Sequence, residues 1–349
     1  MFYDGTKLLS LKDQDGKKPE IFISTSNRSA GKTTWFSRFL VKKFIERGWK
    51  FILIYRFNYE LSDIADKFFK EIRELFFPNY SMESKARAKG IYHELFLFND
   101  VTGTENSCGY AVSLNNADQL KKMSHLFSDV KHMLMDEFQS ETNHYCQDEI
   151  RKFISLHTTV SRGAGKQIRD VPVYMLGNYV SLLNPYYVEL GISSRIQYNT
   201  KFLRGHGFVL EQGFNMTASQ LQKNSRFNTA FSQNRYVEYS SDRVYLNDNA
   251  AFIETPSGSS RYICTIKYND RNYAVRSYPD HGIVYCDDNA DLTYPVKLSL
   301  STADHDINYV MLKQNDMFIQ SLRTYFEHGS FRFKNADCKQ TILQICAYR

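Results

Sequence analysis

The sequence predicts an α/β fold for residues 1–197, followed by a smaller α+β domain. Two observations indicate the first part: short apolar runs alternate with amphipathic segments, and one run leads through a Gly-Lys-Thr triplet into a helical pattern. From about residue 245 the pattern changes to short strands joined by tight turns. We therefore expect a first domain over 1–197, a linker or lid over 198–244 and a second domain over 245–349.

Composition narrows the class of protein. Hydrophobic residues make up 42% of the 349, and no apolar run approaches the ~20 residues that span a membrane. The start of the chain does not have the pattern of a signal peptide. The six cysteines contain no Cys-x-x-Cys pair, so we expect reduced thiols in a cytoplasmic protein, and no membrane partner.

A basic stretch indicates a possible nucleic-acid contact. The net charge is +6, and residues 195–245 carry seven Lys or Arg against three Asp or Glu, with aromatic residues interleaved. Such a segment can contact a phosphate backbone. A solvated linker surface explains the same composition equally well.

The first element is a strand over residues 21–25 that leads into a phosphate-binding loop. Residues 26–33 read Ser-Asn-Arg-Ser-Ala-Gly-Lys-Thr and match Gly-x-x-x-x-Gly-Lys-Ser/Thr, except that Ser26 takes the first glycine position. We expect Lys32 to contact the β- and γ-phosphates of ATP and the Thr33 hydroxyl to hold Mg²⁺. The alternative is a chance Gly-Lys-Thr before a helix. The expected nucleotide-binding residues are Ser26, Asn27, Arg28, Ser29, Ala30, Gly31, Lys32, Thr33, Thr34, Arg56 and Asn178.

The next elements continue the alternation. The patterns predict strands over 51–55 and 95–98, and helices over 60–76 and 117–127. The apolar run 130–135 then ends in Asp136-Glu137. Asp136 is placed to hold Mg²⁺ through water, and Glu137 to polarise the attacking water. A turn that merely begins with two acids is the alternative.

One more strand, over 171–176, ends at Gly177-Asn178. The Asn178 amide at the tip of this strand can bond the γ-phosphate or the attacking water, although a strand-end turn residue explains it as well. Intervening strands between the loop and the acids favour a P-loop ATPase of the additional-strand, catalytic-glutamate type, with Glu137 and Lys32 as catalytic residues.

Several basic residues are candidates for acting on the γ-phosphate. Arg28 lies within the loop and Arg56 follows the second strand. A glycine-bearing loop at 161–169 holds Arg162, Lys166 and Arg169, a reasonable place for an arginine finger supplied to a neighbouring subunit, and we favour Arg162. Such a finger is worth ~10³–10⁵ in rate. Each of these residues is otherwise a surface or ion-paired cation.

Taken together, these segments resemble the genome-packaging ATPases of small tailed double-stranded DNA phages of the phi29 type. The resemblance rests on the loop and Asp136-Glu137, and on four further segments: 51–57, 159–162, Asn-Tyr-Val-Ser at 178–181 and Asn-Pro-Tyr at 184–186. It implies a homomeric ring, commonly a pentamer, at the portal vertex of an empty procapsid. It also implies ATP-driven movement of double-stranded DNA, a portal partner, and in some motors a structural RNA. In this family the trans arginine falls on or near Arg162, and the missing first glycine is a departure.

The second domain begins with strands over 262–268 and 273–276 that form a hairpin, then a strand over 282–286. Helices are expected over 310–327 and 337–347. This order fits a ribonuclease-H-like fold. Two-metal nuclease chemistry needs several inward carboxylates, and residues 262–268 carry none, so we expect a nuclease fold without nuclease residues that docks on the portal. An active nuclease is the alternative.

Other functions compete with a DNA-translocating motor. A nucleotide kinase needs an acceptor site and a dedicated lid, and a helicase shows further motifs that we do not find. A helicase-like ATPase stimulated by nucleic acid, and a portal adaptor that uses nucleotide only for assembly, remain the alternatives.

Overall fold

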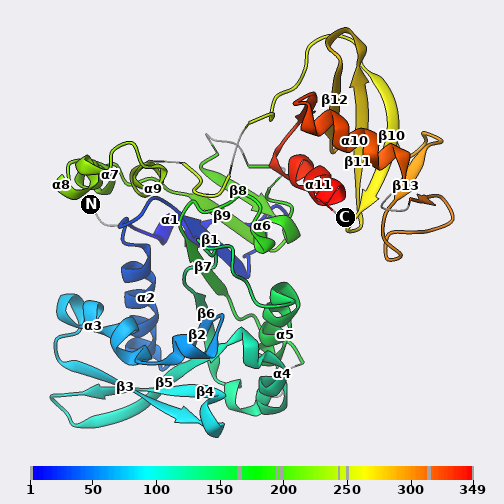
Figure 1. Cartoon of the computed structure of the whole chain (residues 1–349). Helices are drawn as coiled ribbons and strands as arrows, with labels where there is room; N and C mark the ends of the chain where they lie inside the picture. The colour runs from blue at the N-terminus through cyan, green and yellow to red at the C-terminus, as the bar shows by residue number, and fades with distance from the viewer. Residues whose placement is uncertain are drawn as a thin grey trace. The chain divides into compact units, whose positions relative to one another are not determined.

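The computed structural model describes residues 3–162, 167–193, 195–196, 200–242, 244–248, 251–312 and 316–347. The chain divides into two compact units, one of residues 1–190 and 196–247 and the other of residues 191–195 and 248–349 (Figure 1). The α/β class expected for the first unit is confirmed. Across the described residues, no helix has the length and apolar character needed to cross a membrane.

The first unit contains one nine-stranded sheet in the order β3-β4-β5-β2-β6-β7-β1-β9-β8. The strands from β5 to β9 in this order are parallel, and antiparallel strands flank them. The strands are β1 (Ile21–Thr25), β2 (Lys50–Tyr55), β3 (Tyr80–Arg87), β4 (Tyr92–Asn99), β5 (Thr104–Ser113), β6 (Val130–Met135), β7 (Val173–Gly177), β8 (Phe202–Gly205) and β9 (Phe208–Gln212).

Helices cover both faces of this sheet, with α2 and α3 on one side and α4 and α5 on the other (Figure 1). The helices are α1 (Thr6–Ser10), α2 (Lys32–Arg47), η1 (Asn58–Leu61), α3 (Ile64–Phe76), η2 (Ala88–Gly90), η3 (Leu114–Asn116), α4 (Ala117–Leu120), η4 (Lys121–Phe127), α5 (Glu149–Ser161), α6 (Pro185–Glu189), α7 (Met216–Lys223), α8 (Arg226–Ala230) and α9 (Arg235–Ser241). Central strands such as β2 are apolar on both faces because helices bury both. Phe36 of α2, for example, packs on Tyr174 of β7 with ring centroids 5.2 Å apart.

The second unit holds a six-stranded sheet in the order β14-β13-β10-β11-β12-β15. Its elements are β10 (Arg261–Tyr268), β11 (Arg271–Tyr278), η5 (Pro279–His281), β12 (Ile283–Asp287), β13 (Lys297–Ser299), β14 (Val310–Met311), α10 (Met317–Glu327), β15 (Phe331–Phe333) and α11 (Ala336–Ala347). The predicted hairpin is present, and both residues of its turn, Asn269 and Asp270, have positive φ. This is the backbone of the two-residue turn that matches strand twist.

The structure corrects several expectations. Residues 198–244 are not a linker, because β8 and β9 lie within them and β9 pairs with β1 in the central sheet. β3 and β5 were not predicted at all, and the helix expected from residue 310 begins only at Met317, after the short strand β14. The helix α5 was also missed. The unit boundary after residue 247 lies close to the expected one at 245.

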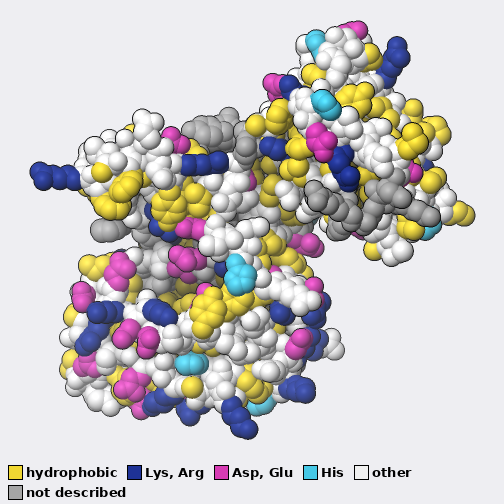
Figure 2. Space-filling model, viewed as in Figure 1, with side chains coloured by type: hydrophobic (Ala, Val, Ile, Leu, Met, Phe, Trp, Pro, Cys, Tyr) yellow, Lys and Arg dark blue, Asp and Glu magenta, His cyan; other side chains and the backbone are white. Residues whose placement is uncertain are grey.

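The described surface carries charges of both signs. On the face shown in Figure 2, Lys and Arg side chains are interspersed with Asp and Glu, and no large area of one sign is visible. The net charge of +6 therefore does not concentrate on this face.

Candidate active site

The phosphate loop connects β1 to α2, at the carboxyl edge of the parallel strands. Gly31 is the N-cap of α2 and has φ 92°, a conformation that favours glycine. Ser26 occupies the first glycine position of the pattern without strain, since its φ is not positive. The Ser26 side chain is buried, and its Oγ accepts a hydrogen bond from Lys32 Nζ at 2.6 Å. The serine therefore holds the lysine of the loop in place.

Lys32 points into the carboxyl edge of the sheet. Its Nζ lies 2.6 Å from Ser26 Oγ and 3.3 Å from Asn178 Oδ1, which brings together the loop and the strand end predicted from sequence. Burial lowers the pKa of Lys32 to about 8, while Asp136 and Glu211 oppose this shift. A buried cation with few counter-charges is unfavourable in free energy, so an anion that binds beside Lys32 would be stabilised.

Asp136 and Glu137 follow β6, as predicted. Asp136 accepts the Glu137 backbone N–H at 2.9 Å, and the Thr33 hydroxyl lies beside its carboxylate. Desolvation raises the pKa of Asp136, against the opposing effects of Thr33 and Lys32. Glu137 has φ 52°, in the left-handed region where non-glycine residues are uncommon. Desolvation, followed by the charges of Asp136 and Glu141, raises the pKa of Glu137.

These residues surround one cavity of about 440 Å³, within the range of small-ligand sites. It is lined by Arg28, Ser29, Ala30, Gly31, Lys32, Thr33, Thr34, Glu71, Asp136, Glu137, Gly177 and Asn178. The expected residues from Arg28 to Thr34 thus converge with the two acids and Asn178. Glu71 of α3 was missed, and its Oε1 accepts a hydrogen bond from the Thr34 hydroxyl at 3.2 Å. Its signal in sequence was weak, because it is one of many polar residues on a helix surface.

Ser26 and Asn27 lie behind the cavity instead of lining it. The Asn27 side chain accepts a hydrogen bond from the Asn215 N–H at 2.9 Å and donates one to the Asn215 carbonyl at 3.1 Å. Asn215 is the N-cap of α7, in the segment expected to be a linker. The loop is therefore tied to the chain that follows β9.

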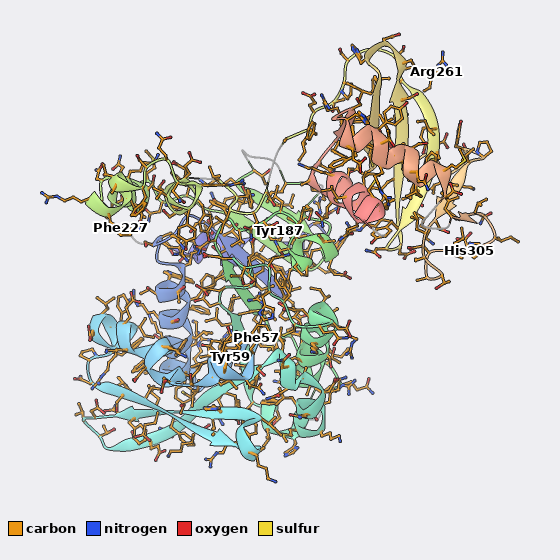
Figure 3. All side chains as sticks on the ribbon, in the orientation of Figure 1. Phe57, Tyr59, Tyr187, Phe227, Arg261 and His305 are labelled. Atoms are coloured by element: carbon orange, nitrogen blue, oxygen red, sulfur yellow. The ribbon has the colours of Figure 1, made fainter. Side chains whose placement is uncertain are left out.

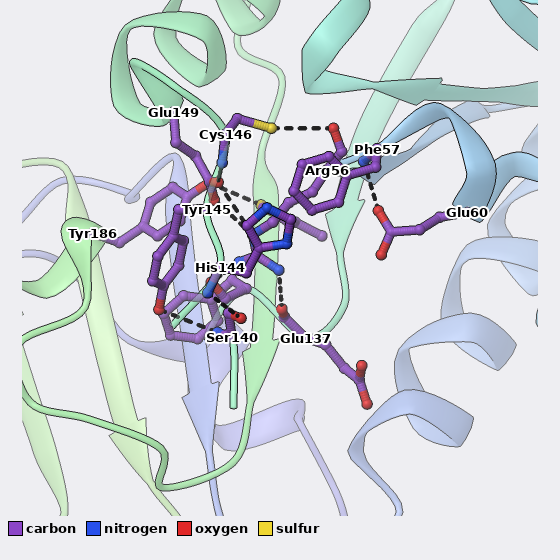
Figure 4. Close-up of polar contacts among 12 residues, drawn as sticks. Arg56, Phe57, Glu60, Glu137, Ser140, His144, Tyr145, Cys146, Glu149 and Tyr186 are labelled. Carbon is purple, nitrogen blue, oxygen red and sulfur yellow. Dashed lines mark hydrogen bonds and ion pairs between the residues drawn. The ribbon is translucent and has the colours of Figure 1, made fainter. Parts of the chain in front are cut away.

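Arg56 has a different role from the predicted nucleotide contact. Its guanidinium pairs with buried Glu149 at 2.9 Å and donates to the carbonyls of Glu137 (2.9 Å) and Phe138 (Figure 4). Tyr186 donates a further hydrogen bond to Glu149 at 2.8 Å. Arg56 does not line the 440 Å³ cavity. In this structure it fixes the backbone of Glu137, because its donors are engaged by protein acceptors.

The other basic residues predicted to act on the γ-phosphate lie in different environments. Arg28 lines the cavity and pairs with Glu141 at 2.7 Å. Arg169 is buried and donates to the carbonyls of Phe127, Val130 and Val160, so it is not available as a finger. Arg162 is exposed at the C-cap of α5. Lys166 lies outside the described residues.

The acids of the second unit form no comparable site. Asp287 pairs with Arg276 at 2.7 Å, Asp288 with Lys334, and Asp306 with Lys267 at 3.7 Å. Asp304 accepts the backbone N–H groups of the hairpin turn at 2.7 and 3.0 Å. Nowhere in the described parts of the chain do three His, Cys, Asp or Glu residues gather as a metal site would require.

With this geometry established, comparison with known proteins decides the family. A model described as Podovirus DNA encapsidation protein (Gp16) matches residues 1–347. The chain belongs to this family. It is 25% identical to the DNA packaging protein of Bacillus phage phi29 over 312 residues, covering 88% of this chain and 87% of the phage protein. It is 26% identical to that of Bacillus phage B103 over 314 residues, covering 88% and 90%.

Solved structures of the same group share the fold. A chain of the bacteriophage phi29 viral genome packaging motor assembly matches with a TM-score of 0.71 at 21% identity, covering 99% of both chains. A chain of the phi-28 gp11 DNA packaging motor matches with a TM-score of 0.62 at 15% identity, covering 100% and 98%. The predicted family, and a function in phage DNA packaging, are confirmed.

Proposed function

We propose that this chain hydrolyses ATP and uses the energy to move double-stranded viral DNA into an empty procapsid. The observation that carries the proposal is the convergence of Lys32, Thr33, Asp136, Glu137 and Asn178 on one cavity at the carboxyl ends of parallel strands. In open α/β sheets, ligands bind at this edge. A buried lysine and two acids that line the same cavity support a phosphate ligand that brings its own cation.

Mg²⁺ fits the donors present. The Thr33 hydroxyl and the Asp136 carboxylate line the same cavity beside each other, and both are the oxygen ligands that Mg²⁺ prefers. Protein sites usually give Mg²⁺ only one or two carboxylates, and the phosphates and water supply the remaining ligands. When bound, the cation would neutralise charge on the β- and γ-phosphates.

The protein groups divide the work. Lys32 binds and orients the phosphates, and Asn178, which shares a hydrogen bond with Lys32, aligns the γ-phosphate or the water. Glu137 accepts a proton from the attacking water; its raised pKa makes it a better base than an ordinary glutamate. Two buried donors that line the neighbouring wall, Arg28 Nε and Gln139 Nε2, have no protein acceptor in the described structure, and a phosphate oxygen or water would satisfy them.

The wider assembly is part of the same proposal. We expect a homomeric ring, a pentamer, bound to the portal of the procapsid in the host cytoplasm, and in some settings joined by a structural RNA. Arg162 cannot serve its own phosphate loop, since α5 runs 13 residues, about 20 Å, away from the Arg56–Glu149 pair before reaching it. A finger role therefore requires a second subunit.

For the second unit we propose a ribonuclease-H-like fold that docks on the portal, and its strand order supports this. Antiparallel β10, β11 and β12 are followed by β13 and β14, which add in parallel on the other side of β10. Asp287, Asp288 and Asp306 are paired with cations and Asp304 caps a turn, which favours docking over nuclease chemistry.

Steady-state ATP hydrolysis with and without double-stranded DNA tests the proposal. DNA should stimulate the wild-type protein, and Lys32→Ala should abolish turnover in both conditions. Activity without any DNA response would contradict a motor. Stimulation by single-stranded nucleic acid with strand separation would favour a helicase-like enzyme, and nucleotide-dependent portal binding without turnover would favour an adaptor.

A further inference from the structure

The carboxylate of Glu141 joins three parts of the first unit. Glu141 lies in the loop between β6 and α5, and its Oε1 accepts hydrogen bonds from Arg28 Nη2 of the phosphate loop and from the Tyr239 hydroxyl of α9, both at 2.7 Å. Its Oε2 accepts one from the Tyr236 hydroxyl, also of α9, at 3.0 Å. The Glu141 carbonyl accepts another from the side-chain amide of Asn247 at 3.0 Å. One acid thus connects the phosphate loop, the loop after β6 and α9.

These contacts engage only part of the Arg28 guanidinium. Its central carbon lies 5.3 Å from the centre of the Tyr236 ring and 5.8 Å from that of Tyr239, within the range of a cation–π contact. The Nε atom is buried and has no hydrogen-bond partner in the part of the chain that the structure describes. Because a guanidinium presents five N–H donors in a fixed plane, Glu141 can hold one edge of Arg28 while another edge binds an anion.

Arg28 lies at the end of the phosphate cavity where the γ-phosphate is expected. It lines both the cavity of about 440 Å³ and a neighbouring cavity of about 250 Å³, and Glu137 and Asn178 line both as well. The smaller cavity is also lined by Tyr59 and Glu60, which follow β2. Arg28 therefore stands beside the acid proposed as the base and the amide proposed to align the γ-phosphate.

Arg28 also has room to turn away from this position. A third cavity, of about 470 Å³, lies between the phosphate loop and the group of helices α7, α8 and α9 (Figure 1), with Arg28 and Ser29 on one side. On the other side are residues of α8 and α9, among them Phe227, which Figure 3 labels and which is 72% exposed. A long side chain beside such a space can adopt several rotamers, so a contact that selects one of them matters for binding.

The groups that hold Glu141 are themselves fixed. Tyr239 is fully buried and packs in an apolar cluster with Tyr179 and Val180, the two residues that follow Asn178. Its hydroxyl therefore presents a donor to Glu141 at a defined place. The charge of Glu141 is offset by the Arg28 guanidinium and by two hydroxyl donors, which keeps the carboxylate between α9 and Arg28.

We propose that Glu141, held by Tyr236 and Tyr239, positions Arg28 to bind the γ-phosphate. This inference rests on the proposed ATPase. Glu141 is a positioning residue and not a phosphate ligand, because its negative charge would repel a phosphate. Arg28 then meets the nucleotide with its side chain already ordered, and donors fixed in advance stabilise developing charge better than mobile ones.

Equilibrium binding of ADP and ATPγS tests this, because only ATPγS carries a group at the γ position. The ratio of their dissociation constants, measured with Mg²⁺ on the full-length protein, gives the preference for that group. Glu141→Gln keeps the shape of the side chain and removes the charge that holds Arg28. It should lower the preference about three- to thirtyfold, and Arg28→Gln about ten- to hundredfold, the range of a hydrogen bond to a charged group. ADP affinity should change little in both variants, which shows that the site is folded.

The matched control is Glu238→Gln. Glu238 is an exposed acid of α9 outside the contacts of Glu141, so its substitution removes the same charge from the same region and should leave the preference unchanged. An unchanged preference in Glu141→Gln would overturn the inference. A larger preference would overturn it too, because Glu141 would then hold Arg28 away from the phosphate.

A mutant cycle tests whether Glu141 acts through Arg28. Glu141→Gln combined with Arg28→Gln should lower the preference no further than Arg28→Gln alone, and additive losses would contradict the positioning role. Tyr236→Phe combined with Tyr239→Phe removes both hydroxyls and keeps the rings that face Arg28. This protein should lose part of the preference, and a value equal to that of the wild type would overturn the part assigned to α9.

Steady-state hydrolysis separates this inference from the proposed function. A protein that distinguishes ATPγS from ADP through Glu141 but whose hydrolysis does not respond to DNA would contradict the motor and leave the positioning role intact. DNA-stimulated hydrolysis with an unchanged preference in Glu141→Gln would do the reverse.

Discussion

The two units of the molecule use the same kind of element, a mixed sheet with acids at its strand ends, and treat those acids differently. In the first unit, Asp136 and Glu137 follow β6 with raised pKa values and no arginine or lysine on their carboxylates among the described contacts. In the second, Asp287 is the last residue of β12, Asp288 follows it, and each is paired with a cation. The contrast teaches that position at a strand end does not make a site; an acid must also lack a structural partner.

The largest expected effect is on ATP hydrolysis, when an acid at a strand end is replaced in each of the two units. Glu137→Gln keeps the shape of the side chain and removes the base, so hydrolysis should fall by about 10²- to 10⁴-fold, while binding of a fluorescent ATP analogue persists. The matched change in the second unit, Asp288→Asn, should alter turnover less than about twofold. If both variants hydrolyse ATP equally well, Glu137 is not the base.

The next effect concerns a buried pair against an exposed one. Glu149→Gln leaves Arg56 buried without its counter-charge and should lower the free energy of unfolding by about 3–5 kcal/mol. Glu105→Gln, which breaks an exposed pair with Lys85, should cost less than about 1 kcal/mol. Urea unfolding measures both. Equal costs would remove the distinction between a positioning pair and a surface pair.

A smaller effect is expected at Gly177, at the end of β7. A Cβ there would lie 2.9 Å from Phe138 Cε1, and Phe138 is fully buried. Gly177→Ala should therefore destabilise by about 1–3 kcal/mol and lower kcat, because Phe138 follows Glu137. Gly207→Ala, where no atom lies within 4 Å but φ is +74°, isolates the backbone strain alone. Thermal unfolding of both variants separates crowding from strain.

The smallest effect is a pH dependence. The pKa of free Lys32 is about 8, and a bound phosphate raises it, so nucleotide binding should take up a proton between about pH 8 and 10. Affinity should then weaken as pH rises through this window. Calorimetry in buffers of different ionisation enthalpy measures the uptake. Lys32→Arg, which stays charged, should bind without it; uptake of the same size in that variant would assign the proton to another group.

The sequence predicted the phosphate loop, Asp136-Glu137 and Asn178 because each is a local pattern at the end of an apolar run. It did not predict β3 or β5, whose polar residues, as in Thr104–Ser113, do not form an apolar run. It did not predict β8 or β9 either, since the basic and aromatic composition of 198–244 was interpreted as a linker or lid, although β9 pairs with β1.

Roles that depend on remote partners were beyond the sequence. Arg56 follows an apolar strand, as a nucleotide-facing arginine would, but its partner Glu149 lies 93 residues away along the chain. Likewise, nothing in the chain order brings Glu60 and Tyr59 to the same cavity as Glu137. Contacts between residues so far apart in the chain can be inferred only when the order of the strands in the sheet is known.

The paired hydrogen bonds between Asn27 and Asn215 have a mechanical consequence. They attach the phosphate loop to the N-terminus of α7. The strand before that helix, β9, is itself hydrogen-bonded to β1, the strand that leads into the loop. A displacement of the loop when phosphate binds or leaves would therefore displace the helices that follow β9. Residues 198–244, expected to be a linker or lid, would then move together with the phosphate loop.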